Sequence, residues 1–132
     1  MIADPCSDFI IRLKNAYQAG HRELNMPSTQ LIHHIAKLMS KHAFIGKVTE
    51  ISTPSSPKKQ LKIVLIYPDG KPALQNVKRL SRPGRRLYVA VADIPWVSAP
   101  NALIIISTSS GIMSHRQAVS RKLGGELIAE IW

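Results

Sequence analysis

The stretch LIIISTSSGIMSHRQAVSRKLGGELIAEIW, residues 103–132, decides how the second half of this chain folds. It opens with an unbroken apolar run at Leu103–Ile106, short and rich in β-branched residues, which predicts a buried strand. We expect a tight loop at the end of this strand, because hydroxyl residues and a glycine follow directly. These loop residues are Ser107, Thr108, Ser109, Ser110 and Gly111.

A short helix is expected directly after the hydroxyl loop. Ser114 can cap the first turn and Gln117 can answer it, which is the pattern of a capping box. Gly124 would close the helix, and Glu126–Trp132 predicts a returning strand. The loop would then lie between a strand and a helix N-terminus, where N–H and O–H groups can hold an anion. The alternative is an ordinary strand–helix–strand connection whose serines serve as turn and cap residues.

The composition indicates a folded protein with an anionic partner. Its 132 residues suit one domain or two small lobes, and 45% apolar residues suffice for a core. Eighteen Lys and Arg against eight Asp and Glu give a formal net charge of +10, which favours nucleic acid or an acidic membrane surface as partner. The single cysteine, Cys6, excludes an internal disulfide and predicts a buried small side chain. No metal site and no cofactor are expected.

Residues 1–69 predict an N-terminal lobe with the order α-β-α-β-β. Phe9, Leu13 and Tyr17 recur at helical spacing and would form the apolar stripe of the first helix. The other expected elements are a strand at Arg22–Met26, a helix capped by Ser28, a strand at Phe44–Ile51, a loop at Thr53–Lys59 and a strand at Leu61–Ile66.

Residues 70–132 predict a C-terminal lobe that is mostly β with one short helix, so the chain is expected to be α+β. Strands are expected at Leu74–Leu80 and Leu87–Val91. Ile94–Trp96 is expected to form a short helical turn, with the indole of Trp96 packed against the protein.

A cationic turn, SRPGRR, separates the two expected strands of this lobe. The Pro-Gly pair would fix the turn, so that Arg82, Arg85 and Arg86 stand on a stiff support and lose little freedom on binding. Arginine's planar fork suits phosphate oxygens, which favours a phosphate-contacting surface over a merely solvated loop. Tyr88 directly after the turn could stack on a base or sugar, or pack on the sheet.

Five motifs follow one another along the chain. They are DPCSDFIIRLKNA at Asp4–Ala16, MPST at Met26–Thr29, RLSRPGRRLY at Arg79–Tyr88, ISTSSGIMSHRQA at Ile106–Ala118 and LGGELIAEIW at Leu123–Trp132. Together they resemble the small ribosomal subunit protein family eight, in its bacterial and organellar branch. The resemblance covers essentially the whole chain, and the STSxGIM motif is specific.

This resemblance implies a two-lobed α+β protein that is a structural part of the small ribosomal subunit and not an enzyme. Members of the family bind the central domain of the small-subunit ribosomal RNA, chiefly through the second lobe, and support assembly of the platform beside neighbouring small-subunit proteins. The expected location is the ribosome of a bacterial cytoplasm, a mitochondrion or a plastid, with no membrane partner and no small-molecule substrate.

The resemblance also carries site residues over to matching positions. The hydroxyl loop would face the RNA, Tyr88 and Glu126 would lie at that same face, and Arg12 and Asn15 would approach a second RNA helix. Together with the charge pattern, the expected RNA-binding residues are Ser107, Thr108, Ser109, Ser110, Gly111, Tyr88, Arg82, Arg85, Arg86, Glu126, Arg12, Asn15 and Lys37.

Two other classes of function compete with RNA binding. A small hydrolase or phosphate-ester transferase could use a loop serine with His115 as an exposed base, but no G-x-S-x-G elbow, paired acids or Gly-rich phosphate loop accompanies them. A basic membrane-surface protein would need a cationic amphipathic helix with bulky apolar anchors, which the sequence lacks.

Overall fold

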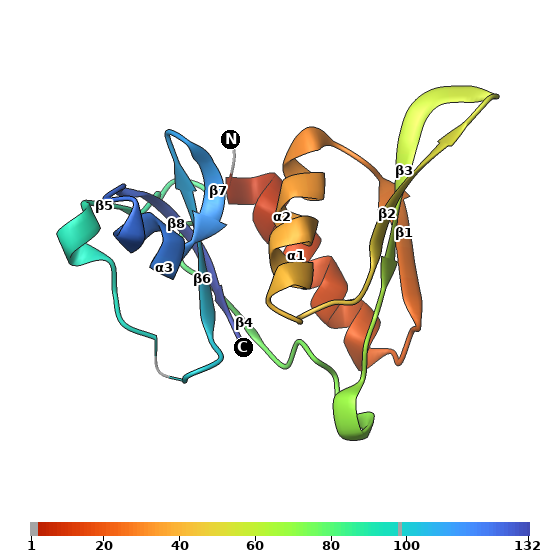
Figure 1. Cartoon of the computed structure of the whole chain (residues 1–132), viewed down its shortest axis with the longest axis horizontal. Coiled ribbons are helices and arrows are strands. Elements are labelled where there is room, and N and C mark those ends of the chain that lie inside the picture. The colour runs from red at the N-terminus through yellow and green to blue at the C-terminus, as the bar shows by residue number, and fades with distance from the viewer. Residues whose placement is uncertain (1–2, 98) are drawn as a thin grey trace. The chain divides into compact units, whose positions relative to one another are not determined.

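The computed structural model describes residues 3–97 and 99–132 and contains helices and antiparallel sheets (Figure 1). The predicted α+β class is confirmed, and α3 is the expected short helix of the C-terminal half. None of the described helices has the length and apolar character needed to cross a bilayer. In chain order the elements, with η for 3-10 turns, are α1 (Ala3–Gln18), β1 (Glu23–Pro27), α2 (Gln30–Lys41), β2 (Val48–Thr53), β3 (Ser56–Val64), η1 (Pro68–Gly70), β4 (Val77–Arg79), β5 (Tyr88–Val89), η2 (Val91–Asp93), β6 (Leu103–Thr108), β7 (Gly111–Ser114), α3 (His115–Ser120) and β8 (Gly125–Ile131).

The chain divides into two compact units. The N-terminal unit is Ile11–Gln75, and the C-terminal unit contains Asn76–Trp132 together with the residues up to Ile10. The first turns of α1 therefore belong with a sheet that is distant from them in sequence. The boundary expected between residues 69 and 70 stays a prediction.

The N-terminal unit contains a three-stranded antiparallel sheet in the order β1-β3-β2. Met26 of β1 pairs with Leu61 of β3, and both side chains are buried, as is Ile63 two residues further along β3. Lys62 between them points to the opposite face, because successive side chains of a strand alternate. Helix α2 packs against β2 of this sheet, and the predicted order α-β-α-β-β is confirmed.

Three local predictions in this unit were wrong, and one of them is the strand expected from Phe44, which begins only at Val48. Thr29, not Ser28, caps α2, since its hydroxyl oxygen accepts a hydrogen bond of 3.2 Å from the N–H of Ile32. The expected loop at Thr53–Lys59 is mostly strand, because the β2–β3 ladder continues to the pair Thr53–Ser56 and leaves a two-residue turn. Backbone pairing extends the hairpin past the point where its apolar alternation stops.

Glu50 accepts a hydrogen bond from the hydroxyl of Ser28, the residue that the sequence predicts as the helix cap. Ser28 donates to its carboxylate at 2.8 Å, and Lys59 and His33 lie 3.3 and 3.5 Å from it. The hydrogen bonds from Ser28 and Lys59 hold the pKa of Glu50 below its usual value. This carboxylate therefore links the strand that carries it to β3 and to the start of α2.

Tyr17 connects three segments of the N-terminal unit. Its buried hydroxyl donates to the carbonyl of Phe44 at 2.8 Å and accepts from the N–H of Ile66 at 3.2 Å. Its ring meets Tyr67 edge to face with centroids 5.3 Å apart, and Tyr67 in turn donates to the carbonyl of His21. Burial raises the pKa of Tyr17, so the hydroxyl keeps the proton that it donates.

The C-terminal unit is built on a five-stranded antiparallel sheet. Its strand order is β4-β8-β6-β7, and β5 pairs with β8 on the same edge as β4. The core of one face consists of Ile104, Ile106, Met113, Ala118 and Leu127. The predicted last strand, Glu126–Trp132, is confirmed as β8, which pairs with β4, β5 and β6.

The helix opens where the sequence predicts, with Ser114 as its N-cap, but it does not follow the hydroxyl loop directly. Strand β7 intervenes, because Gly111–Ser114 pairs antiparallel with β6 and buries Met113. Ser114 nevertheless caps α3 as predicted, accepting from the N–H of Gln117 at 3.1 Å. The helix ends at Ser120 rather than Gly124, and Lys122 adopts a left-handed conformation with φ 58°.

Other predictions for this lobe were partly wrong. Strands β4 and β5 are shorter than expected, and the helical turn lies at Val91–Asp93. Trp96 does not pack, since its side chain is 97% exposed. The reason is local: Ile94 and Val97 pack on the core and leave the indole between them outside.

Replacing Tyr17 with phenylalanine should lower the free energy of unfolding by about 1–3 kcal/mol, because a buried carbonyl and a part-buried N–H would lose their partner. Tyr67→Phe is the matched control. Its hydroxyl is exposed, so its loss should cost less than about 1 kcal/mol. Urea unfolding followed by circular dichroism measures both changes, and equal losses would contradict the role of Tyr17.

Candidate nucleic-acid interface

The hydroxyl residues form the tip of the β6–β7 hairpin. Ser107 pairs with Ile112 and Thr108 with Gly111, so Ser109 and Ser110 make the two-residue turn between the strands. Because β7 separates this tip from α3, the helix N-terminus cannot supply N–H groups there. The expected anion site between loop and helix is therefore corrected to an exposed hairpin tip.

Thr108 fixes the shape of the tip. Its hydroxyl donates to the carbonyl of Gly111 at 2.9 Å and its oxygen accepts from the N–H of Ser110 at 3.1 Å. Gly111 has a φ of 108°, a conformation that favours glycine. The side chains of Ser109 and Ser110 are exposed at the end of this braced turn. Thr108 and Gly111 thus shape the tip, while the two serines are placed to contact a partner.

Three of the expected site residues stand in one row across the sheet. Glu126 of β8 pairs with Tyr88 of β5 on one side and with Ser107 of β6 on the other. Directly opposed residues in a sheet share a face, so the three side chains face the same way. Tyr88 is 68% exposed beside the hairpin tip, which leaves its ring available to a partner.

Glu126 and Arg86 are turned toward the protein. Glu126 is only 6% exposed, and its Oε2 lies 3.7 Å from Nη1 of Arg86. Cys6 of α1 is buried as predicted, and burial together with the negative charge of Glu126 raises the pKa of its thiol to about 12. The Arg86–Glu126 pair therefore lies at the centre of the row, between Tyr88 and Ser107, where it can hold the row in place.

The glycine pair at the start of β8 permits the close approach of three strands. A Cβ on Gly125 would lie 2.1 Å from the carbonyl oxygen of Ser107, and one on Gly124 would lie 2.4 Å from that of Val89. Both contacts are with backbone, which cannot move aside cheaply. The sequence predicts Gly124 as a helix stop, and two adjacent glycines at the start of a strand also indicate close backbone contact.

The cationic turn is as stiff as its sequence predicts. Arg82 and Arg85 exchange backbone hydrogen bonds of 3.0 and 2.9 Å across Pro83-Gly84, and Gly84 has a φ of 78°. Both arginine side chains are exposed. With neighbouring strand residues they line a groove of about 320 Å³, whose basic members are Lys78, Arg79, Arg82 and Arg85.

The expected site residues of the N-terminal unit lie on its helices. Arg12 and Asn15 are exposed on α1, and Lys37 is exposed on α2. They belong to a different unit from the hairpin tip.

His115 does not have the exposure expected of a catalytic base. It is buried, and its Nδ1 accepts a hydrogen bond of 3.1 Å from the N–H of Ile104. Its ring therefore joins α3 to β6. Within the described ranges no group of three His, Cys, Asp or Glu side chains is placed to hold a metal ion.

Comparison with known proteins agrees with the motifs. The family description "Ribosomal protein S8" matches residues 4–132. The chain is 39% identical over 132 residues to a protein of Nitratidesulfovibrio vulgaris (strain DSM 19637 / Miyazaki F), and 38% and 41% identical over 133 residues to proteins of Dehalococcoides mccartyi and Sorangium cellulosum. Each alignment covers 100% of both chains, and each relative is named small ribosomal subunit protein uS8. The family resemblance predicted from the sequence is confirmed.

Replacing Thr108 with valine should lower the free energy of unfolding by about 0.5–1.5 kcal/mol. The tip loses one hydrogen-bond donor and one acceptor, while the side chain at this position keeps nearly the same size and shape. Ser109→Ala and Ser110→Ala are the matched controls and should change it by less than about 0.5 kcal/mol, since both side chains are exposed. Denaturant titration of the three variants checks this. A loss at either serine as large as that at Thr108 would contradict the division between bracing and exposed hydroxyls.

Proposed function

The chain belongs to the ribosomal protein S8 family, and we propose that it is a structural constituent of the small ribosomal subunit that binds small-subunit ribosomal RNA. We place its main RNA interface on the C-terminal unit and its target in the central domain, where binding would support assembly of the platform. The observation that carries this proposal is the braced, exposed hydroxyl tip, aligned with exposed Tyr88 and accompanied by a basic groove in the same unit.

Ser109 and Ser110 are the proposed reading groups of the tip. Hydroxyl groups can both donate and accept, so they can pair with 2′-hydroxyls and with base edges in an irregular RNA region. Thr108 and Gly111 would contribute by holding the turn, and Ser107 by standing in the cross-strand row. Tyr88 would stack on an unpaired base or a sugar, because its ring is exposed at the end of that row.

Arg82 and Arg85 are the proposed phosphate contacts. They are exposed on a stiff turn, so the backbone that carries them loses little conformational freedom when RNA binds. Lys78 and Arg79 line the same groove and would add to the local positive potential. Neutralising phosphates releases condensed counterions, which makes such binding strongly salt-dependent.

Arg86 and Glu126 are proposed to influence RNA binding indirectly, by positioning other residues of the interface. Both were expected at the RNA face, but Glu126 is buried and the two charges lie 3.7 Å apart. Their pairing would set the position of Tyr88 and Ser107, which flank Glu126 in the sheet. A carboxylate is also a poor direct partner for phosphate, since like charges repel.

In the N-terminal unit, Arg12, Asn15 and Lys37 are proposed to approach a second RNA segment. Their exposure and charge or polarity are the support for this assignment. We place the protein in a ribosome of bacterial type, with RNA and neighbouring small-subunit proteins as partners. No catalytic role is proposed. His115, the histidine nearest to the loop serines in the sequence, has a structural role, since its ring accepts a hydrogen bond from the N–H of Ile104.

Changing Ser109 and Ser110 together to alanine should weaken binding to the specific ribosomal RNA fragment by about five- to 150-fold, the equivalent of two lost hydrogen bonds at roughly 0.5–1.5 kcal/mol each. Binding to an unrelated RNA of equal length should be nearly unchanged, because that binding is mainly electrostatic. Filter binding on both RNAs measures the difference. Equal weakening on the two RNAs would remove the reading role of the tip.

Changing Arg82 and Arg85 together to alanine should flatten the dependence of log K on log salt by about one to two, since each lost phosphate contact contributes roughly 0.7–0.9 to the slope. Lys47→Ala, an exposed cation of the N-terminal unit outside both helices, is the control and should leave the slope unchanged. Titrations at several salt concentrations supply the slopes. An unaltered slope in the double variant would exclude these arginines as phosphate contacts.

A further inference from the structure

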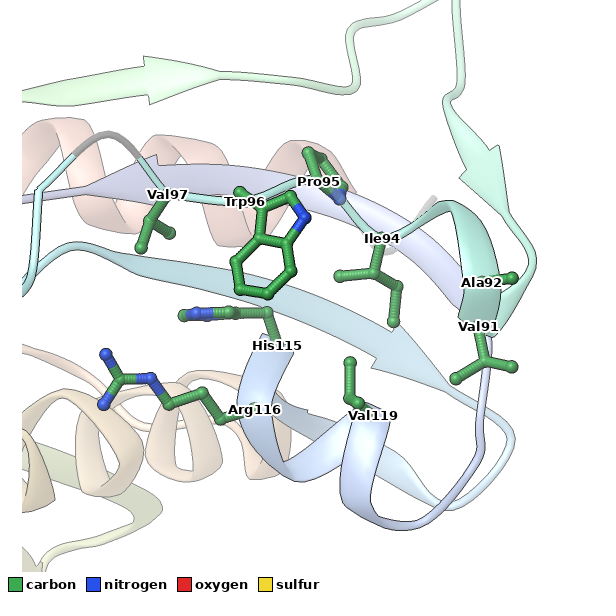
Figure 2. A pocket seen from close by; sticks show the side chains of 9 residues that line it. All are labelled: Val91, Ala92, Ile94, Pro95, Trp96, Val97, His115, Arg116 and Val119. Carbon is green, nitrogen blue, oxygen red and sulfur yellow. The ribbon is translucent and has the colours of Figure 1, made fainter.

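We propose that a groove beside α3 binds a segment of another small-subunit protein that carries a bulky apolar side chain and a carboxylate. The groove has a volume of about 510 Å³ (Figure 2). Ile94, Trp96 and Val97 line one side of it, and His115, Arg116 and Val119 of α3 line the other. The proposal rests on the proposed place of this chain in the small subunit, and it uses none of the RNA contacts described above.

The apolar surface of this groove is unusually open to water. Trp96 and Val119 are 97% and 50% exposed, and Figure 2 shows their side chains over the same groove. Ile94 and Val97 near Trp96 pack on the core, so the backbone at this point directs the indole outward. An exposed apolar groove that carries an exposed aromatic ring is a typical protein-binding feature.

The charge of the groove argues against RNA as its occupant. Arg116 is the one permanently charged side chain among the lining residues, and His115 is buried with its Nδ1 engaged by the N–H of Ile104. A polyanion is held by several cations, and four cations of this unit, Lys78, Arg79, Arg82 and Arg85, line the other groove. Tryptophan and arginine together are instead characteristic of the energetic centres of protein interfaces.

Arg116 defines the polar part of the partner. Its Nη2 donates to the carbonyl of Pro100 at 3.0 Å, which anchors an otherwise exposed guanidinium. Arginine has five N–H donors in a planar fork, so an anchored guanidinium still suits a carboxylate. Because the side chain is already held, little freedom is lost on binding. A second copy of this chain is a poor occupant, since each copy carries a net charge of +10.

Trp96 supplies a direct readout of occupancy. The chain has two tryptophans, so Trp132→Phe leaves Trp96 as its sole tryptophan, which is excited at a wavelength that tyrosine does not absorb. Each other small-subunit protein of the source ribosome, purified singly, is titrated into this variant, and naked small-subunit ribosomal RNA is titrated separately. The expected result is a blue shift of the emission with one of the proteins and none with the RNA, because the indole leaves water.

Two substitutions test the groove itself. Trp96→Ala and Arg116→Glu should each weaken that protein's binding by at least about tenfold, as at an interface centre. Binding is then followed through a dye on the partner. Arg121→Glu is the matched control: it makes the same charge change just beyond α3, outside the groove, and should leave the affinity unchanged.

Several outcomes would overturn the proposal. These are no emission shift with any protein, a shift with RNA alone, a shift on concentrating the chain by itself, or equal weakening by Arg116→Glu and Arg121→Glu. The RNA filter-binding assay on the parent chain is a separate readout. Loss of specific RNA binding there, with the protein-induced shift intact, would count against the RNA interface and not against the groove.

Discussion

Close contact between the backbone of β8 and its neighbours is the constraint on which the C-terminal unit depends. At Gly125 a side chain would lie 2.1 Å from the carbonyl oxygen of Ser107, and at Gly124 it would lie 2.4 Å from that of Val89. Because both positions lack a Cβ, β5 and β6 can pair with the same end of β8. This pairing aligns Tyr88, Glu126 and Ser107, and it sets where the hairpin tip emerges from the sheet. The proposed RNA surface thus depends on the close approach of the backbones of β5, β6 and β8.

The arginines of the cationic turn SRPGRR lie in different environments. Arg82 and Arg85 are exposed, whereas Arg86, at the start of the segment leading into β5, lies 3.7 Å from buried Glu126. A buried ion pair adds little net stability, because the loss of hydration offsets most of the attraction. Removing one partner alone would nevertheless leave an uncompensated charge inside the unit. The pair is therefore best understood as a positional constraint, while the exposed arginines supply the long-range potential that attracts RNA.

Two exposed aromatic side chains in this unit have different surroundings. Tyr88 stands near hydroxyl groups and in a strongly basic unit, which suits stacking on RNA. Trp96 stands in an apolar groove with a single anchored arginine, which suits an apolar protein segment. The partner of an exposed aromatic ring is therefore inferred from the charges and hydroxyl groups around it, because exposure alone does not distinguish RNA from protein.

The sequence by itself determined the α+β class, the α-β-α-β-β order of the first half, the cap at Ser114, the stiff arginine turn and the family, because these depend on local periodicity, turn chemistry and motif order. It did not reveal β7, since Gly111–Ser114 becomes a strand only by pairing with β6. Nor could it show that Glu126 turns inward, that the first turns of α1 join the distant sheet, or that Trp96 stays exposed. Those features were decided by tertiary structure, because each depends on which backbones and side chains meet across long separations in the chain.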